Sequence, residues 1–247
     1  MTIKSQTDID GLRAVGQVVA AVLRNMLQAI EPGMSTAELD EIGRAQFDKY
    51  GARSAPQLLY RFPAATCISI NEEAAHGIPG ARRIAAGDVV NVDVSAELDG
   101  YFADTGGTSV VPPSTPVKTR LCHAARLALD AALKEARAGN RINRIGKAIE
   151  RVAKMHGFKT IRNLAGHGVG KSLHEAPDGI VSFFDPTDLR VLQEGMVIAI
   201  EPFLSTQSRF AVEQDDGWTL ATAVGNLSAQ YEHTVVVTRS APLVLTH

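Results

Sequence analysis

Apolar residues recur every three or four positions near the start of the chain. They form one unbroken stripe from Asp8 to Ile30, and the stripe stops at Pro32-Gly33. This spacing predicts an amphipathic helix. Ser35 and Glu38 have the spacing of a capping box, so a second helix is expected to run from there to Gly51.

The pattern changes to strict alternation between Asp88 and Glu97. One face carries apolar side chains and the other carries polar ones: Val90, Val92, Val94 and Ala96 against Asn91, Asp93, Ser95 and Glu97. Such alternation predicts a β-strand. Asp99-Gly100 is a strong signal for a two-residue turn, so residues 101–110 are expected to return as the antiparallel partner.

The second half of the chain repeats this order. Two further helices are expected over residues 117–138 and 142–155, followed by several short strands. Three segments also match segments roughly 100 residues later: 42–45 with 145–148, 76–78 with 167–169, and 87–93 with 195–201. We therefore predict one domain spanning 1–247, built from duplicated halves at about 8–111 and 116–239 that face each other across a cleft.

The composition excludes several classes of protein. The chain has 247 residues, of which 45% are hydrophobic and 21% charged, with 27 acidic and 25 basic side chains. This balance argues against disorder, a surface that coats nucleic acid and a polybasic membrane patch. Cys67 and Cys122 allow no disulfide framework, and no apolar run suits a secretory signal or a membrane span. A cytoplasmic protein is expected.

Two carboxylates are expected to share one face of the predicted hairpin. If Leu98 pairs with Tyr101, Ser95 lies opposite Asp104, and Asp93 is the diagonal neighbour of Asp104 at about 7–8 Å. Like charges this close destabilise a fold unless a proton or a cation lies between them. The hairpin is therefore a candidate metal site.

Further candidate ligands lie on short apolar segments of the second half: His167, Glu201 and Glu232. The duplication aligns Glu201 with Asp93 at the end of the matched strands. Taken singly, each acid is explained more simply by a solvated surface or a buried ion pair. Together, four carboxylates and one imidazole suit a pair of divalent first-row ions such as Mn, Fe or Co better than a thiolate zinc site.

These residues fall within a series of motifs that resembles the type I methionine aminopeptidases, and the resemblance covers nearly the whole chain. The motifs are, in order, Cys67-Ile68-Ser69-Ile70-Asn71-Glu72, His76-Gly77-Ile78-Pro79, Val92-Asp93-Val94, Asp104-Thr105, Gly166-His167-Gly168-Val169-Gly170, His174-Glu175, Ile200-Glu201-Pro202 and Ala229-Gln230-Tyr231-Glu232-His233-Thr234. The resemblance implies an α+β protein of the pita-bread fold. In that fold, two pseudo-symmetric helix-helix-strand halves surround a central antiparallel sheet and form a single catalytic domain.

The resemblance also implies a dinuclear metal site. Asp93, Asp104, His167, Glu201 and Glu232 would bind two divalent ions (Co, Mn, Fe or Zn), with Asp104 and Glu232 bridging them. A hydroxide between the ions would attack the first peptide bond, while one ion polarises the carbonyl and the other holds the α-amine. Glu201 would also move the proton from water to the leaving amine. The expected reaction removes the initiator methionine when the second residue is small.

Five residues are implied in substrate binding. His174 would donate a hydrogen bond to the developing oxyanion, and His76 would contact the backbone amide of the substrate. Phe62, Cys67 and Trp218 would form the apolar pocket, with Cys67 as a small wall and not a nucleophile.

The sequence departs from the commoner bacterial pattern at the rim of that pocket. Pro56 and Leu59 occupy positions where a cysteine and a tyrosine are frequent, and Phe62 replaces another tyrosine. The sequence alone therefore does not determine the contacts at the rim of the pocket.

Three other interpretations compete. Residues 165–172 resemble a relaxed P-loop of an NTPase, although Pro177 and Gly179 interrupt the helix that a P-loop requires. A pita-bread protein that has lost its metals and acts by contact with peptides or the ribosome is disfavoured by the five ligand types. Aminopeptidase P and prolidase usually carry a large N-terminal domain, whereas here the repeat begins near residue 8. Type II methionine aminopeptidases carry a helical insertion that the short interval between His174 and Glu201 lacks.

The resemblance finally implies partners. Peptides with an N-terminal methionine and nascent chains are the expected substrates, and the ribosome exit region is a further partner. Neither specific nucleic acid nor membrane is expected to bind, and the protein is expected to be a monomer.

Overall fold

The computed structural model describes every residue of the chain, 1–247. Its first two helices are α1 (Gln6–Ala29) and α2 (Thr36–Tyr50), close to the predicted bounds. The expected capping box of Ser35 and Glu38 is present. Helix α1 begins earlier than the apolar stripe suggests, because Ser5 and Asp8 form a second capping box.

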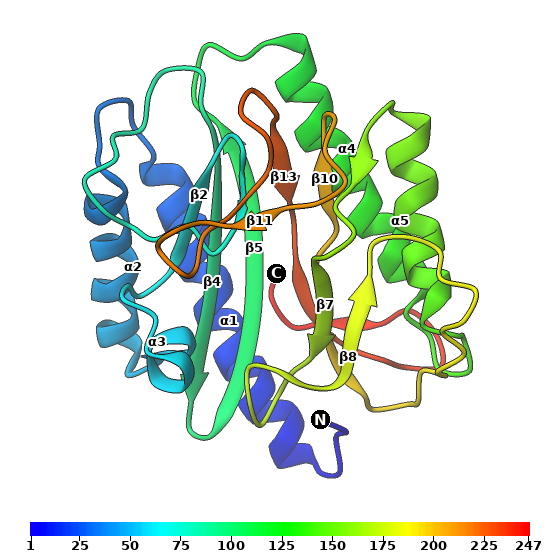
Figure 1. The fold of residues 1–247 in the computed structure, drawn as a ribbon. Helices are drawn as coiled ribbons and strands as arrows, with labels where there is room; N and C mark the ends of the chain where they lie inside the picture. The colour runs from blue at the N-terminus through cyan, green and yellow to red at the C-terminus, as the bar shows by residue number, and fades with distance from the viewer.

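A four-stranded antiparallel sheet forms the first half of the molecule (Figure 1). Its strands are β1 (Arg53–Ser54), β2 (Cys67–Ile70), β4 (Val89–Leu98) and β5 (Tyr101–Val110). The predicted hairpin register is confirmed, since Leu98 pairs with Tyr101 and Ser95 with Asp104. Helix α1 packs against β4 and β5 and buries its apolar stripe there.

The polar face of β4 is buried as well as its valine face, which alternation alone did not reveal. Asn91 and Ser95 are each only 6% exposed. The amide nitrogen of Asn91 donates to Oε1 of Gln230, which belongs to the second half of the chain. The polar face therefore lies at the contact between the halves and not in solvent.

Helices α4 (Pro116–Glu135) and α5 (Asn143–Met155) open the second half, near their predicted positions. They pack beside a five-stranded antiparallel sheet of order β15-β14-β9-β7-β8. Its strands are β7 (Ala165–Gly168), β8 (Glu175–Val181), β9 (Val197–Ile200), β14 (His233–Val236) and β15 (Leu243–Val244). Two helices followed by strands thus occur in each half, while the duplication of the sequence stays a prediction.

Two smaller sheets complete the fold. One contains β6 (Lys159–Thr160), β10 (Phe203–Ser205) and β13 (Ser228–Gln230). The other contains β3 (Glu73–Ala75), β11 (Val212–Glu213) and β12 (Leu220–Ala221), so a hairpin of the second half pairs with a strand of the first. In Figure 1 the segment of β11 crosses in front of β4 and β5. The predicted mixture of helices and antiparallel strands is confirmed, and no helix has the length and apolar character needed to span a bilayer.

Hydrogen bonds also join β5 directly to the segment that leads into β14. The backbone N–H of Glu232 donates to the carbonyl of Gly106 over 2.9 Å, and the Thr105 hydroxyl donates to the carbonyl of Glu232. Next to them, the N–H of Asp104 donates to the Thr234 hydroxyl, which in turn donates to the carbonyl of Asp104. The relative position of two acidic residues from different halves is therefore set by four hydrogen bonds.

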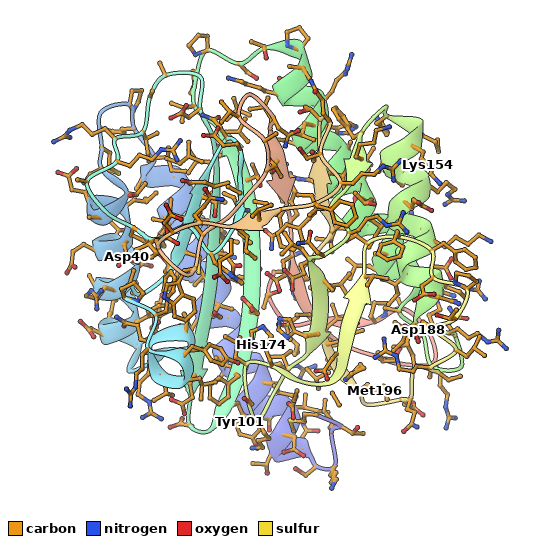
Figure 2. The ribbon with its side chains drawn as sticks, in the orientation of Figure 1. Asp40, Tyr101, Lys154, His174, Asp188 and Met196 are labelled. Atoms are coloured by element: carbon orange, nitrogen blue, oxygen red, sulfur yellow. The ribbon has the colours of Figure 1, made fainter.

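The short helix α3 (Ala55–Tyr60) is held at both ends. The Ser54 hydroxyl caps its start and donates to the carbonyl of Ala65 over 2.7 Å. Beyond the helix, the buried carboxylate of Asp40 (Figure 2) accepts hydrogen bonds from the N–H groups of Ala65 and Thr66 and from the Thr66 hydroxyl. The segment that leads from α3 to β2 is thereby fixed to α2.

Gly146 marks a close approach between α5 and the segment that contains β8. A Cβ atom at Gly146 would lie 2.1 Å from the backbone oxygen of Phe183 and 2.5 Å from that of Val181. Gly43 of α2 is also buried, but a Cβ atom there would first meet the flexible end of Met26, at 2.7 Å from its sulfur.

We expect Gly146→Ala to lower the free energy of unfolding by about 1–3 kcal/mol, because backbone oxygens cannot turn aside as a side chain can. This cost outweighs the gain of about 1 kcal/mol in helix propensity. Gly43→Ala is the matched control and should cost clearly less. Urea denaturation followed by circular dichroism measures both, and equal stabilities for the two variants would contradict the packing argument.

Candidate functional site

A cavity opens between the two halves of the molecule, and His174 lies beside it near the centre of the view in Figure 2. Its lining combines acidic, imidazole and apolar side chains: Pro56, Tyr60, Phe62, Cys67, His76, Asp93, Ser95, Asp104, His167, Leu173, His174, Glu201 and Trp218. Every predicted site residue is among them except Glu232, which groups with Asp104 and His167. The structure thus brings all the predicted residues to one place.

The five predicted metal ligands come from strands of both halves. Asp104 and His167 lie in β5 and β7, while Glu201 directly follows β9 and Glu232 directly precedes β14. Asp93 lies in the middle of β4 and not at a strand end, as the aligned repeat had suggested, because β4 continues to the turn of the hairpin. Ligand atoms of Asp104, His167 and Glu232 all lie within 4.8 Å of one another.

The imidazole of His167 has a defined orientation. Its Nδ1 lies 2.9 Å from the carbonyl oxygen of Gly168, which can only accept, so Nδ1 carries the proton. Burial lowers the pKa of His167 to about 3, which leaves the ring neutral. The bare Nε2 therefore faces Glu201 Oε1 at 3.5 Å and Asp104 Oδ2 at 3.7 Å. A lone pair aimed at carboxylate oxygens is the arrangement of a ligand that shares a cation with them.

Two buried oxygens of this cluster have no hydrogen-bond partner, Oδ1 of Asp104 and Oε1 of Glu232. Asp104 is 6% exposed and Glu232 only 1%. Unpartnered carboxylate oxygens at such depth are costly, and a divalent cation would satisfy both together with the Nε2 lone pair. The residues present therefore fit a metal site.

The carboxyl groups are strongly perturbed. Burial raises the pKa of Asp93 to about 6 and raises the pKa values of Asp104, Glu201 and Glu232 well above the usual range. For the last three groups, the charges of neighbouring carboxylates add to the effect of burial. Without a cation, the cluster would hold protons that carboxyl groups normally lose near pH 4.

Gln230 takes part in this cluster, although the sequence analysis assigned it no role. Its side chain is buried, and its Nε2 donates to Oε2 of Glu232 over 3.0 Å. Its Oε1 accepts from Nδ2 of Asn91, which fixes the orientation of the amide. One oxygen of Glu232 is thereby held and the other is left free. The motif Ala229-Gln230-Tyr231-Glu232 contained the residue, but only the fold shows its contact.

The three residues predicted to form the apolar pocket lie together in the lining of the cavity. The rings of Phe62 and Trp218 meet edge to face, with centroids 5.2 Å apart. Cys67 lies beside them and pairs with Asp93 in the register of β2 and β4. Burial raises the pKa of the Cys67 thiol further above its usual value, so the thiol stays protonated and contributes a soft surface, not a nucleophile.

The structure shows which of the rim positions line the cavity. Pro56 lines the cavity, whereas Leu59 is 39% exposed and lies outside the lining. Tyr60, the last residue of α3, lines the cavity instead. The sequence analysis missed Tyr60, since the family pattern directs attention to position 59.

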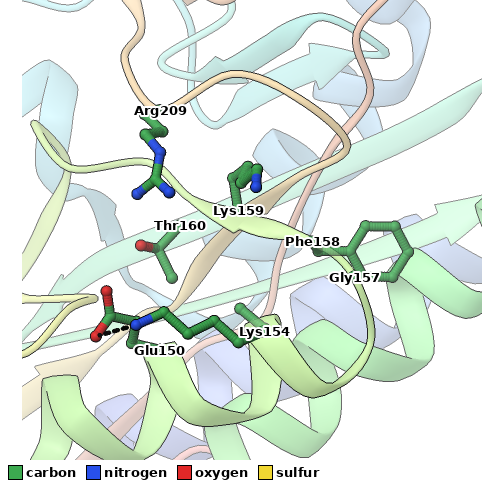
Figure 3. A pocket seen from close by; sticks show the side chains of 8 residues that line it. Glu150, Lys154, Gly157, Phe158, Lys159, Thr160 and Arg209 are labelled. Atoms are coloured by element: carbon green, nitrogen blue, oxygen red, sulfur yellow. Dashed lines mark ion pairs between the residues drawn. The ribbon is translucent and has the colours of Figure 1, made fainter.

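The P-loop interpretation loses its basis. The Gly166–Ser172 segment leads from β7 through a bend into strand β8, and no helix follows, so it is not a P-loop. A second hollow near the C-terminal end of α5 is lined mainly by polar and basic side chains, among them Lys154, Lys159 and Arg209 (Figure 3). None of the predicted site residues lies there.

The chain matches known metallopeptidases in sequence and in structure. The model of metallopeptidase family M24 matches residues 10–239. The chain is 45% identical over 247 residues to methionine aminopeptidase 2 of Bacillus subtilis (strain 168). The alignment covers 100% of this chain and 99% of that protein. The methionine aminopeptidase of Thermotoga maritima has a TM-score of 0.95 at 33% identity, covering 100% of this chain and 99% of the other. The prolidase of Pyrococcus furiosus has a TM-score of 0.79 at 22% identity, and 65% of its chain is covered.

The crowded carboxyl groups predict how the metal-free protein responds to pH. Because their folded-state pKa values are raised, stability is fully present below the unfolded pKa of about 4 and is lost as pH rises through the folded values. For Asp93, with a folded pKa of about 6, part of this loss falls between pH 5 and pH 8. We expect urea denaturation of chelated protein to show lower stability at pH 8 than at pH 5, and Mn²⁺ or Co²⁺ to restore the difference.

Asp104→Asn provides the control for this experiment. The substitution removes one buried charge and one ligand, so the metal-free variant should be more stable than the parent at pH 8 and gain little from added metal. Metal-induced stabilisation equal to that of the parent would contradict the role of Asp104 as a ligand.

Proposed function

The chain belongs to metallopeptidase family M24, and from its similarity over its full length to methionine aminopeptidases we infer that it is a methionine aminopeptidase. It hydrolyses the first peptide bond of chains that begin with methionine. Full-length identity of 45% to one methionine aminopeptidase and a TM-score of 0.95 to another support this function.

One observation carries the proposal from family to chemistry. Asp104, His167 and Glu232, with two unpartnered carboxylate oxygens, form a ligand cluster beside a cavity whose opposite wall contains the Phe62–Trp218 pair. Removal of an apolar first residue requires a pocket for its side chain and, next to that pocket, metal ligands for hydrolysis of the peptide bond. A metal-free binding protein would have no use for such a costly cluster.

The proline-directed relatives are a weaker match. The prolidase likeness, at 22% identity, supports a common fold only, and the chain spans about two thirds of that protein. The methionine aminopeptidases are instead matched over nearly their whole length.

We propose that the cluster holds two divalent ions, with Asp93, Asp104, His167, Glu201 and Glu232 as ligands and Asp104 and Glu232 shared between the ions. The unpartnered oxygens belong to these two shared residues, which supports their bridging role. When bound, such ions lower the pKa of water and polarise a carbonyl group. Their identity among Co, Mn, Fe and Zn is left to experiment.

We assign the transfer of the proton to Glu201. Its carboxyl group lies beside His167 and its pKa is raised by burial, so the carboxylate accepts a proton readily. In the proposed reaction, a Glu201 oxygen takes a proton from the attacking water and delivers it to the nitrogen of the leaving amine.

Two histidines at the cavity would contact the substrate. His174 would donate a hydrogen bond to the carbonyl oxygen as negative charge develops, and His76 would contact the backbone amide. The backbone of His76 is left-handed, with φ of 55°, directly after β3. A residue other than glycine seldom adopts this conformation. Its presence at His76 is consistent with a functional role for the direction of the imidazole ring.

The substrates and the setting complete the proposal. Phe62, Cys67 and Trp218 would bury the methionine side chain, and a small second residue is expected. Nascent chains in the cytoplasm would be the natural substrates, with the enzyme acting as a monomer near the ribosome exit.

Glu201→Gln should separate catalysis from metal binding. We expect kcat at saturating metal to fall at least about 100-fold, because the amide cannot accept the proton, while calorimetry still detects metal binding. Glu194→Gln, on the exposed surface, is the control and should leave both quantities unchanged. Parental turnover by metal-loaded Glu201→Gln would show that the proton moves elsewhere.

The pocket predicts a ranking of substrates. Met-Ala peptides should have higher kcat/KM than Leu-Ala peptides. The factor should be modest, because apolar pockets distinguish side chains by only about 1–3 kcal/mol per methylene group. Lys-Ala peptides should be cleaved poorly, because an ammonium group buried against the rings of Phe62 and Trp218 would lose its hydration, and Met-Leu should also be cleaved poorly. Comparable kcat/KM for Lys-Ala and Met-Ala would contradict the assignment of this pocket.

A further inference from the structure

The hydroxyl of Tyr60 lies 2.7 Å from Nδ1 of His174, a residue 114 positions away in the chain. The two rings are tilted against each other, with centroids 5.5 Å apart, and both line the cavity. On its other side, the ring of His174 packs against that of His167, at a centroid distance of 4.1 Å. Tyr60 therefore reaches the centre of the site through His174.

Tyr60 is presented by a well-anchored segment. It is the last residue of α3, which begins at the cap of Ser54 with Pro56 in its first turn. Arg61 ends the helix in a left-handed conformation, with φ of 60°, and its N–H donates to the carbonyl of Gln57. With the following loop bound to Asp40, the phenol ring is held over the opening although its outer edge is exposed.

The direction of this hydrogen bond decides what His174 can do. A neutral imidazole has one N–H group, so the atom bound at Nδ1 determines whether Nε2 donates or accepts. For His167, the carbonyl of Gly168 places the proton on Nδ1. For His174 the partner is a phenol, which can donate, and the Tyr60 hydroxyl has no other acceptor in the structure.

The charge states agree with donation by Tyr60. A tyrosine phenol keeps its proton at neutral pH, so Tyr60 has a hydrogen to donate. The His174 ring has its centroid 4.1 Å from that of His167, and a neutral imidazole offers one bare nitrogen that can accept a hydrogen bond. A phenol O–H facing a bare imidazole nitrogen is the stronger of the two possible pairings.

We propose that Tyr60 is a positioning residue for His174: by donating to Nδ1, it keeps the imidazole proton on Nε2 and so makes His174 a hydrogen-bond donor to the substrate carbonyl. The two neighbouring histidines would then carry opposite tautomers, one suited to a ligand and the other to a donor. This inference rests on the proposed function, which gives His174 its role at the oxyanion.

The decisive variant is Tyr60→Phe, which keeps the ring and removes only the hydroxyl. Leu59→Ala is the matched control, because Leu59 is the neighbouring residue of α3, has the same exposed fraction of 39%, and lies outside the cavity. The protein is the full chain loaded with Zn²⁺, which is diamagnetic. The tautomer of His174 is read from long-range ¹H–¹⁵N spectra of the imidazoles, with the signals assigned by their loss in His174→Gln.

We expect the parent to show His174 protonated on Nε2, and Tyr60→Phe to show a mixture of tautomers. With a Met-Ala peptide, kcat of Tyr60→Phe should fall about 10-fold, as loss of one hydrogen bond worth about 1.4 kcal/mol predicts, with KM nearly unchanged. Leu59→Ala should match the parent in both measurements. A structural role alone would not change the tautomer.

Two results would overturn the proposal. One is a parent His174 protonated on Nδ1, and the other is a Tyr60→Phe enzyme with unchanged kcat while His174→Gln is impaired. Full activity of His174→Gln would instead refute the role that the proposed function gives to His174, and the tautomer measurement would still report on Tyr60.

Discussion

The repulsion among buried carboxylates is the constraint on which the rest of this structure depends. Four acidic side chains and one imidazole converge where the two halves meet, and burial raises the pKa of every acid in the group. Such a cluster works against folding until a cation joins it. The surrounding fold must therefore hold the ligands in place without help from their own interactions.

The fold holds the candidate ligands in place through backbone contacts and neutral side chains. Asp93 and Asp104 lie on paired strands, and Glu232 is bound to β5 through the carbonyl of Gly106. Gln230, oriented by Asn91, holds one oxygen of Glu232 and leaves the other free. The polar face of β4 is buried for the same reason, since its amide and hydroxyl groups support the acids where water cannot.

Local signals in the sequence predicted much of this arrangement. Asp99-Gly100 set the hairpin register and thereby the proximity of Asp93 and Asp104. The motifs indicated the remaining candidate ligands, and the structure brings them together. Tyr60 and Gln230 could not be found in this way, because their contacts depend on how α3 is anchored and how β13 lies against β4, and neither follows from residue spacing.

The small sheet of β3, β11 and β12 allows relatives with this fold to differ in substrate preference. His76 follows β3 in the first half, while Trp218 shortly precedes β12 in the second, and the pairing of Leu220 with Ala75 sets the distance between these two walls. The hairpin of β11 and β12, residues 212–221, contains none of the candidate metal ligands. Insertions or deletions in this hairpin would therefore change the width of the pocket while leaving the ligand strands in register, so substrate preference can evolve separately from the chemistry.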